Sequence, residues 1–263
     1  MTTTLRSAAG SDVGQRRPVN QDSAYTSPRV LAVADGMGGH AYGEVASSVA
    51  VRAIADLDEE LAHVDLAQVD LLPTLGEAVT EAARRLTALA ERDPSLRGTG
   101  TTLIAVIVDG TRIGVAHIGD SRAYLLRDGE LHQLTRDHTL VQALVDEGTI
   151  SAEEAIDHPR RSILVRTLQD SSVPEPDLFA VEGRVGDRFL LCSDGVTAVL
   201  DDAAIRRVVS EVAEPAEVVA RLIALANDGG GPDNITAVVA DLVEAQVPAA
   251  GEPVVVGAAA EQG

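Results

Sequence analysis

The sequence predicts an α/β protein of the α+β type, a four-layer α-β-β-α sandwich in which helices flank two antiparallel sheets. Strand-like runs are split by a pair of helical patterns that recurs later in the chain, so the elements do not alternate as in a parallel sheet. Several short strands follow one another across reverse-turn signals. A hydrophobic content of 45% over 263 residues is enough for a large core.

The first part of the chain predicts one central strand and two helices. A polar, turn-rich segment at 11–22 precedes an apolar run at 30–34 that ends at Asp35. Residues 43–62 repeat apolar side chains about every four positions, which is typical of an amphipathic helix. A second such face at 74–91 predicts a second helix.

The middle of the chain changes to short strands, which Asp-Gly and Gly-Asp pairs separate. An antiparallel meander is therefore expected at 102–108, 113–118, 122–126 and 131–134. Residues 138–170 differ, because they hold two short helical patterns, the second opened by Ser151 and Glu154 as a capping box. We interpret 138–170 as a flap inserted into the fold.

The last part of the chain repeats the strand and helix pattern. It predicts strands at 177–182 and 187–193, helices at 201–211 and 215–227, and a strand at 235–243. Residues 6–243 are expected to form one domain, preceded by a flexible N-terminus at residues 1–5. Residues 244–263 are rich in Ala, Gly, Pro and Val without periodicity, and are expected to be a disordered tail.

Composition excludes several classes of function. The formal net charge of -20 argues against a surface for nucleic acid or for an anionic membrane. None of the 21 basic residues is a lysine, which removes the phosphate-loop and Schiff-base lysines. The lone Cys192 has no arginine placed to complete a cysteine phosphatase loop and is expected to be buried. With no signal peptide or membrane-length apolar run, a cytoplasmic protein is expected.

Three aspartates lie where an apolar strand meets a glycine-rich segment. Asp35 precedes Gly36, Asp194 precedes Gly195, and Asp233 lies between a glycine-rich turn and the last strand. An unpaired carboxylate at the end of a buried strand is costly, so an all-oxygen site for a divalent cation is favoured over simple turns. Asp109 and Asp128 also precede glycine and are interpreted as ordinary turn residues.

The ordered set of motifs resembles the bacterial metal-dependent protein phosphatases of the PP2C class (PPM). The resemblance covers about residues 6–243 and is specific because the motifs occur in the family's order. Its motifs are Arg17 with Asn20-Gln21-Asp22, Asp35-Gly36-Met37-Gly38-Gly39-His40, Gly100-Thr101-Thr102, His117-Ile118-Gly119-Asp120-Ser121-Arg122, Asp137-His138, Cys192-Ser193-Asp194-Gly195 and Gly231-Pro232-Asp233-Asn234-Ile235-Thr236.

The resemblance implies a metal centre with two core ions. Asp35 would bridge the two, the Gly36 carbonyl would bind one, and Asp194 and Asp233 would bind the other. Oxygen ligands without His or Cys suit Mn²⁺ or Mg²⁺ rather than zinc. Asp22 would hold metal-bound waters from the second shell, and a water that bridges the metals would attack phosphorus without a covalent enzyme intermediate.

Three further roles are implied by the resemblance. Arg17 would grip the phosphate oxygens as a planar fork. His40 would donate a proton to the departing serine or threonine oxygen. Asp120, together with Asp194, would hold a weaker third ion, although shaping its hairpin is an equally good interpretation of Asp120.

The family implies hydrolysis of phosphoserine and phosphothreonine in proteins. Partners would then be phosphorylated proteins, substrates of a serine/threonine kinase, with no nucleic acid and no membrane, and the chain would act as a monomer. The alternative is a catalytically silent relative that binds a phosphoprotein or another partner. None of the three core aspartates is missing, which favours the active enzyme. A calcium-binding structural domain lacks the clustered aspartate loop that it would need.

Overall fold

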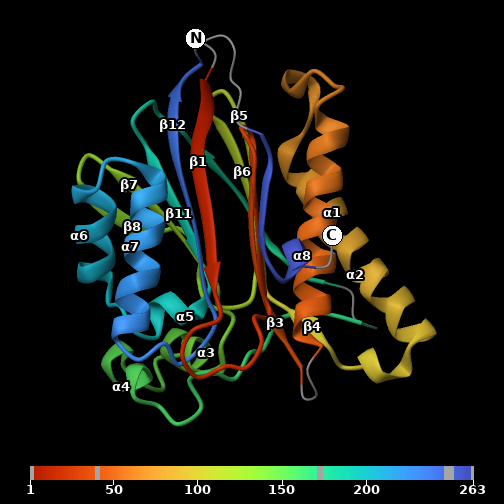
Figure 1. Ribbon diagram of the computed structural model, residues 1–263, viewed down its shortest axis with the longest axis vertical. Coiled ribbons are helices and arrows are strands. Elements are labelled where there is room, and N and C mark those ends of the chain that lie inside the picture. The colour runs from red at the N-terminus through yellow and green to blue at the C-terminus, as the bar shows by residue number, and fades with distance from the viewer. Residues whose placement is uncertain (1–2, 39–41, 171–173, 246–251, 262–263) are drawn as a thin grey trace.

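Two antiparallel sheets lie face to face with helices on both outer sides (Figure 1). The computed structural model describes residues 3–38, 42–170, 174–245 and 252–261. This architecture confirms the predicted α-β-β-α sandwich. None of the helices in these ranges combines the length and the apolar content needed to cross a membrane.

The first sheet brings the two ends of the domain together. In spatial order its described strands are β1 (Thr3–Asp12), β12 (Ile235–Glu244), β11 (Arg188–Cys192), β7 (Arg122–Arg127) and β8 (Glu130–Gln133). Every neighbouring pair is antiparallel. Strand β12 lies between β1 and β11, so a strand from the C-terminal part of the chain occupies the interior of this sheet.

The second sheet contains the predicted central strand. Its main order is β10 (Asp177–Glu182), β6 (Arg112–Ile118), β5 (Leu103–Asp109), β3 (Val30–Met37), β2 (Asp22–Thr26) and β13 (Val254–Gly257). The short strand β4 (Gly100–Thr101) pairs with the end of β3 and with β9 (Leu168–Gln169). The four strands predicted for the meander are present as β5, β6, β7 and β8, but they do not form one meander, because β5 pairs with β6 in this sheet whereas β7 pairs with β8 in the first.

The helices form the two outer layers. Helices α1 (Gly43–Leu61) and α2 (Leu71–Arg92) cover the second sheet, and α6 (Asp202–Glu211) and α7 (Pro215–Asp228) cover the first (Figure 1). Single turns of 3-10 helix occur at Leu66–Gln68 and Pro94–Leu96. The flap contains α3 (Leu140–Asp146) and α4 (Ala152–Ile156), and the predicted capping box of Ser151 and Glu154 begins α4.

The continuous apolar run of β3 follows from burial on both of its faces. Leu31 and Val33 point into the layer between the sheets, whereas Ala32 and Ala34 face the helices. Strands that are covered on both sides are apolar at every position rather than at alternate ones. Packing in the core therefore fixes β3 and places Asp35 near the end of a rigid strand.

Both terminal predictions require correction for the residues that the structure describes, whereas residues 1–2, 246–251 and 262–263 lie outside them. Residues 3–5 are not flexible, because β1 begins at Thr3 and pairs with β12 from Glu244 onward. The tail expected to be disordered contains β13 at Val254–Gly257 and a short helix, α8 (Ala258–Glu261). The β-branched valines pair with the edge strand β2, and Ala258 and Ala259 are buried against it and α1. Local composition did not carry this information, because the pairing partner lies far away in the sequence.

Candidate metal centre

Five aspartates from separate parts of the chain gather at one end of the sandwich. Asp22 begins β2 and lies opposite Asp35 of β3 in the sheet register. Asp194 is the first residue of a short helix, α5 (Asp194–Thr197), directly after β11. Asp120 lies in the turn between β6 and β7, and Asp233 lies just before β12. Strand ends from both sheets thus meet where α5 and β4 lie in Figure 1.

The carboxylates repel one another. Burial raises the pKa of Asp22 and of Asp120 to about 7, and the negative charge of Asp194 contributes to both shifts. Burial and the charge of Asp233 raise the pKa of Asp194 to about 6. For Asp35, burial followed by the charges of its four aspartate neighbours raises the pKa well above its usual value. The cluster therefore favours an added positive charge.

Asp22 lies at the buried side of this cluster. Its side chain is fully buried, and Ser193 Oγ donates to Asp22 Oδ2 at 2.7 Å. The same Ser193 Oγ accepts from the Thr236 amide at 3.0 Å, which fixes the direction of its proton. Among the described residues, the Asp22 Oδ1 atom has no hydrogen-bond partner. A buried carboxylate oxygen without a donor is an available acceptor for a water or an ion.

The backbone around Asp35 is held by close contacts. A Cβ atom at Gly36 would lie 2.0 Å from the Gly43 carbonyl oxygen and 2.6 Å from that of Gln21, so only glycine fits. The Asp35 amide donates to Thr102 Oγ1 at 2.9 Å, and Thr102 Oγ1 lies 2.8 Å from Ser121 Oγ. These contacts fix the strand end from the α1 side and from Thr102, which lies between β4 and β5.

Asp233 is paired with the predicted phosphate-binding arginine. Arg17 donates from a terminal guanidinium nitrogen to Asp233 Oδ2 at 2.6 Å, and about half of the Arg17 side chain is exposed. The neighbouring Asn234 ties the two loops together. Its side-chain amide donates to the Val13 and Val19 carbonyls, and its oxygen accepts from the Gln21 amide. The Arg17 loop is thereby fixed beside Asp233.

Asp120 lies in a tightly built turn. Gly119 has a positive φ of 111°, and its amide donates to His138 Nδ1 at 3.1 Å. On the other side, Arg122 forms a bidentate ion pair with Asp137. Asp120 is partly buried and is not part of that pair, and it lies close enough to the cluster for its charge to raise the pKa of Asp35.

Comparison with known proteins decides the family. A sequence profile described as Protein phosphatase 2C matches residues 10–227. The chain belongs to the protein phosphatase 2C family. The resemblance noted from the motifs is thereby confirmed.

Two relatives and one solved structure illustrate the similarity. The serine/threonine protein phosphatase PstP of Mycobacterium tuberculosis is 51% identical over 244 residues, which cover 93% of this chain and 46% of PstP. The chain therefore spans about half the length of PstP. The serine/threonine phosphatase stp of Listeria innocua is 37% identical, with 86% of this chain and 91% of stp covered. A crystal structure of the PstP catalytic domain with 2 manganese ions has a TM-score of 0.85 and 49% identity, covering 92% of this chain and all of that chain.

The cluster of this protein phosphatase 2C member fits hard divalent cations. The side-chain atoms that could bind a metal are carboxylate oxygens. Among the described residues, the Asp22 Oδ1 atom has no hydrogen-bond partner, and the aspartates repel one another. Mn²⁺ and Mg²⁺ prefer such oxygen ligands. His40, the predicted proton donor, lies outside the described residues.

A second group of potential metal ligands lies close to this turn. His117, His138 and Asp177 each offer one ligand atom within 4.8 Å of the others. However, His138 Nδ1 accepts from the Gly119 amide, so its proton is on Nε2 and is donated to Asp177 Oδ2 at 3.1 Å. His138 thus has no free lone pair for a metal, and we interpret this group as a hydrogen-bonded support for the turn.

Sequence reasoning missed several supporting residues. Ser193 orients Asp22, Thr102 holds Asp35, and Asn234 joins the Arg17 loop to Asp233. All three lie inside the motifs that carried the family resemblance. Their roles depend on contacts across the two sheets, which spacing along the chain does not specify.

Proposed function

We propose that this protein hydrolyses phosphoserine and phosphothreonine monoesters in other proteins and depends on a divalent metal. The carboxylate cluster carries the proposal, since aspartates from both sheets are held together despite their mutual repulsion. The names and metal content of the relatives at 37–51% identity support the same reaction. A cluster of this kind is expensive to maintain without cations.

We assign the core metal positions to the three strand-end aspartates. Asp35, the Gly36 carbonyl, Asp194 and Asp233 would hold the two ions. When bound, a pair of Mn²⁺ or Mg²⁺ ions supplies an activated water for direct attack on phosphorus. Asp22 orients water from the buried side through its free Oδ1 atom, and Ser193 holds its other oxygen.

Arg17 and His40 are assigned to the substrate. Arg17 lies beside Asp233 with an exposed guanidinium, a position from which its planar fork can bind two phosphate oxygens. His40 would protonate the departing serine or threonine oxygen. No cysteine or lysine takes part, since Cys192 is fully buried and burial raises its pKa to about 12.

The partners follow from this reaction. We expect the substrates to be cytoplasmic proteins that a serine/threonine kinase has phosphorylated. We expect the enzyme to act as a monomer. The strongly acidic chain, with a formal net charge of -20, is unsuited to nucleic acid.

Phosphate release from peptides tests the proposal. With Mn²⁺ or Mg²⁺, we expect release from phosphoserine and phosphothreonine peptides, little from phosphotyrosine, and none in excess EDTA. Activity should return when Mn²⁺ is restored, because the chain supplies no nucleophile of its own at this site. Full activity in EDTA would contradict the metal mechanism, and phosphopeptide binding without turnover would favour a silent relative.

Asp120→Ala tests the weaker third ion. If Asp120 and Asp194 share that ion, the variant should have a lower kcat while the two tightest Mn²⁺ sites keep their affinity, because their other ligands lie elsewhere. Calorimetric Mn²⁺ titration and steady-state kinetics measure both. Asp109→Ala is the control, since Asp109 lies in another hairpin and forms an ion pair with the exposed Arg112. An unchanged kcat at every metal concentration would leave Asp120 with a role in the turn alone.

A further inference from the structure

The segment Val254–Glu261 contacts β2, the strand that begins with Asp22 and pairs with β3, which carries Asp35. Strand β13 pairs with β2, so that Gly257 lies opposite Ser23, the residue after Asp22. Gly257 has a positive φ of 74°, and a Cβ atom there would lie 2.2 Å from the Asp22 carbonyl oxygen. The segment therefore packs directly against the backbone of the buried Asp22.

Helix α8 adds a hydrogen-bonded connection. The Ala259 amide donates to Ser23 Oγ at 3.1 Å, Ser23 Oγ lies 2.9 Å from Ser47 Oγ, and Ser47 Oγ donates to the Gln21 carbonyl at 2.5 Å. An amide can only donate and a carbonyl can only accept. The protons of the chain are thus oriented in one direction, with Ser23 donating to Ser47.

The connection ends at the metal centre. The Gln21 carbonyl that accepts from Ser47 also accepts from the Gly36 amide at 3.1 Å. Gly36 is the proposed carbonyl ligand, and Gln21 precedes Asp22. One run of hydrogen bonds therefore joins the docked tail to both strands of the site.

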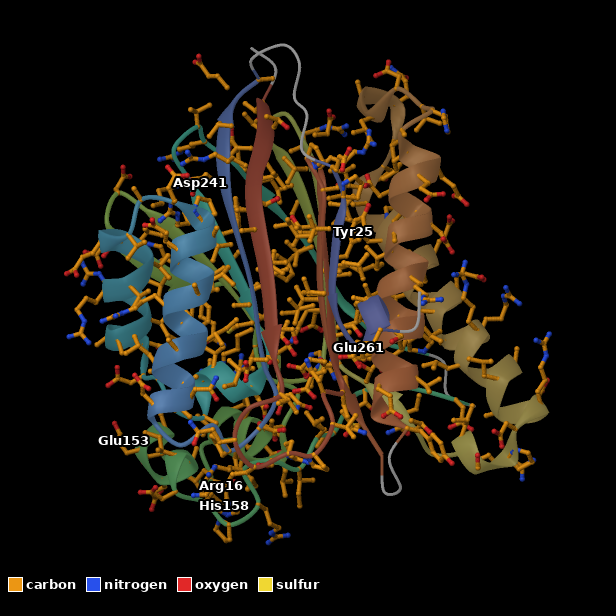
Figure 2. All side chains as sticks on the ribbon, viewed as in Figure 1. Arg16, Tyr25, Glu153, His158, Asp241 and Glu261 are labelled. Carbon is orange, nitrogen blue, oxygen red and sulfur yellow. The ribbon has the colours of Figure 1, made fainter. Side chains whose placement is uncertain are left out.

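The docking site has a defined chemistry. It offers the open edge of β2 and a surface of α1 on which Ala258 and Ala259 become buried, with 2% and 3% exposure. Val256 packs at the layer between the sheets, whereas Val254 and Val255 remain exposed. The site accepts a short extended apolar strand, then a glycine with positive φ, then two small residues. Figure 2 labels Glu261 at the end of this segment, beside α1.

We propose that docking of the segment Val254–Glu261 on β2 and α1 raises the metal affinity of the centre. The coupling rests on the proposed function, because it assumes that Asp22, Asp35 and Gly36 serve a metal. The segment fixes the Asp22 and Gln21 carbonyls, so the strand ends are held in place before an ion arrives. Linkage requires the reverse effect as well, so metal binding should tighten the docked segment.

Two glycine variants of the full chain give a matched test. Gly257→Ala and Gly129→Ala place the same methyl group at similar backbone angles, with φ of 74° and 79°. The new Cβ at Gly257 collides with the Asp22 carbonyl, but at Gly129 it meets nothing within 4 Å. Both variants therefore carry the cost of a side chain at positive φ, and only Gly257→Ala adds the clash. Hydrogen exchange measures docking, and calorimetry measures Mn²⁺ affinity.

Gly257→Ala should remove the exchange protection of 254–261 and weaken Mn²⁺ binding by about fivefold or more, the lower end of typical coupling between sites. Gly129→Ala should change neither. In the wild type, Mn²⁺ should increase protection of 254–261. Ser23→Ala should weaken Mn²⁺ binding while 254–256 stay protected, since the pairing of β13 with β2 uses backbone groups.

The outcomes separate this coupling from the proposed function. If the wild type binds Mn²⁺ and Gly257→Ala loses protection without losing affinity, the coupling is wrong and the metal centre stands. If Gly257→Ala keeps full protection, the docking geometry is wrong. A wild-type protein that binds no Mn²⁺ would contradict the proposed function and the coupling with it.

Discussion

Asp35→Asn is expected to lower the rate of phosphate release by a factor of about a thousand or more. Loss of the Asp35 charge, which we propose as a ligand of the metals, should remove several kcal/mol of transition-state stabilisation, and about 4 kcal/mol corresponds to a thousandfold. Asp233→Asn should have a similar effect on turnover, because it removes another core ligand. Kinetics with saturating Mn²⁺ and calorimetric Mn²⁺ titration measure both variants.

The two variants should differ in their stability without metal. The pKa of Asp35 is raised by burial and by its aspartate neighbours, so its ionised form costs stability once the pH rises above the usual aspartate pKa. The neutral amide of Asp35→Asn should therefore raise the Tm in EDTA at neutral pH. Asp233 instead forms an ion pair with Arg17 at 2.6 Å, so Asp233→Asn should not raise the Tm.

Asp128→Asn is the control for both changes. Asp128 lies in an exposed turn with a positive φ of 53°, a conformation that asparagine also adopts, so activity and Tm should stay unchanged. Near-normal turnover of Asp35→Asn with its metals bound would refute the assignment of Asp35. A lower Tm for Asp35→Asn in EDTA would contradict the account of repulsion in the cluster.

Arg17→Ala is expected to lower kcat/KM by roughly 10- to 150-fold, mainly through KM. A charge-assisted contact of this kind contributes about 1.5–3 kcal/mol, and the metal ligands remain in place. Arg17→Lys should recover part of the loss, because a lysine carries the charge but cannot form two parallel hydrogen bonds. Initial rates over a range of phosphopeptide concentrations separate KM from kcat.

Arg16 provides the neighbouring control. It is exposed at the same end of the molecule as α4 (Figure 2) but lacks the contact with Asp233 that Arg17 makes. Arg16→Ala should be nearly silent. If Arg16→Ala proves as damaging as Arg17→Ala, or if Arg17→Ala leaves kcat/KM unchanged, the assignment of the phosphate-binding arginine is wrong.

The sequence predicted those elements whose pattern is local. The helices α1, α2, α6 and α7 and the apolar strands β3 and β12 follow from their own periodicity and turn residues. Strand β1 was missed because its residues Thr3–Asp12 are mostly small and polar, and its conformation depends on pairing with β12. Strand β13 was missed for the same reason, since three valines in a tail do not reveal an open strand edge elsewhere.

Part of the candidate site could also be predicted from the sequence. Asp35 and Asp194 each follow an apolar strand, so their placement at strand ends could be predicted. The supporting contacts could not, because Ser193 and Asp22 are 171 positions apart and meet only after both sheets form. Nor could the pairing of Arg17 with Asp233, which joins two loops of irregular structure.

The pairing of β1 with β12 makes the metal centre a late product of folding. Strand β12 occupies the interior of its sheet between β1 and β11, and Asp233 immediately precedes it. During synthesis, β1 and β11 therefore have no common neighbour until residue 244 has left the ribosome. Contacts this distant in sequence form slowly and leave strand edges exposed in the meantime. The candidate metal centre can therefore assemble only after β12 has been synthesised, and until then β1 lacks the strand with which it pairs.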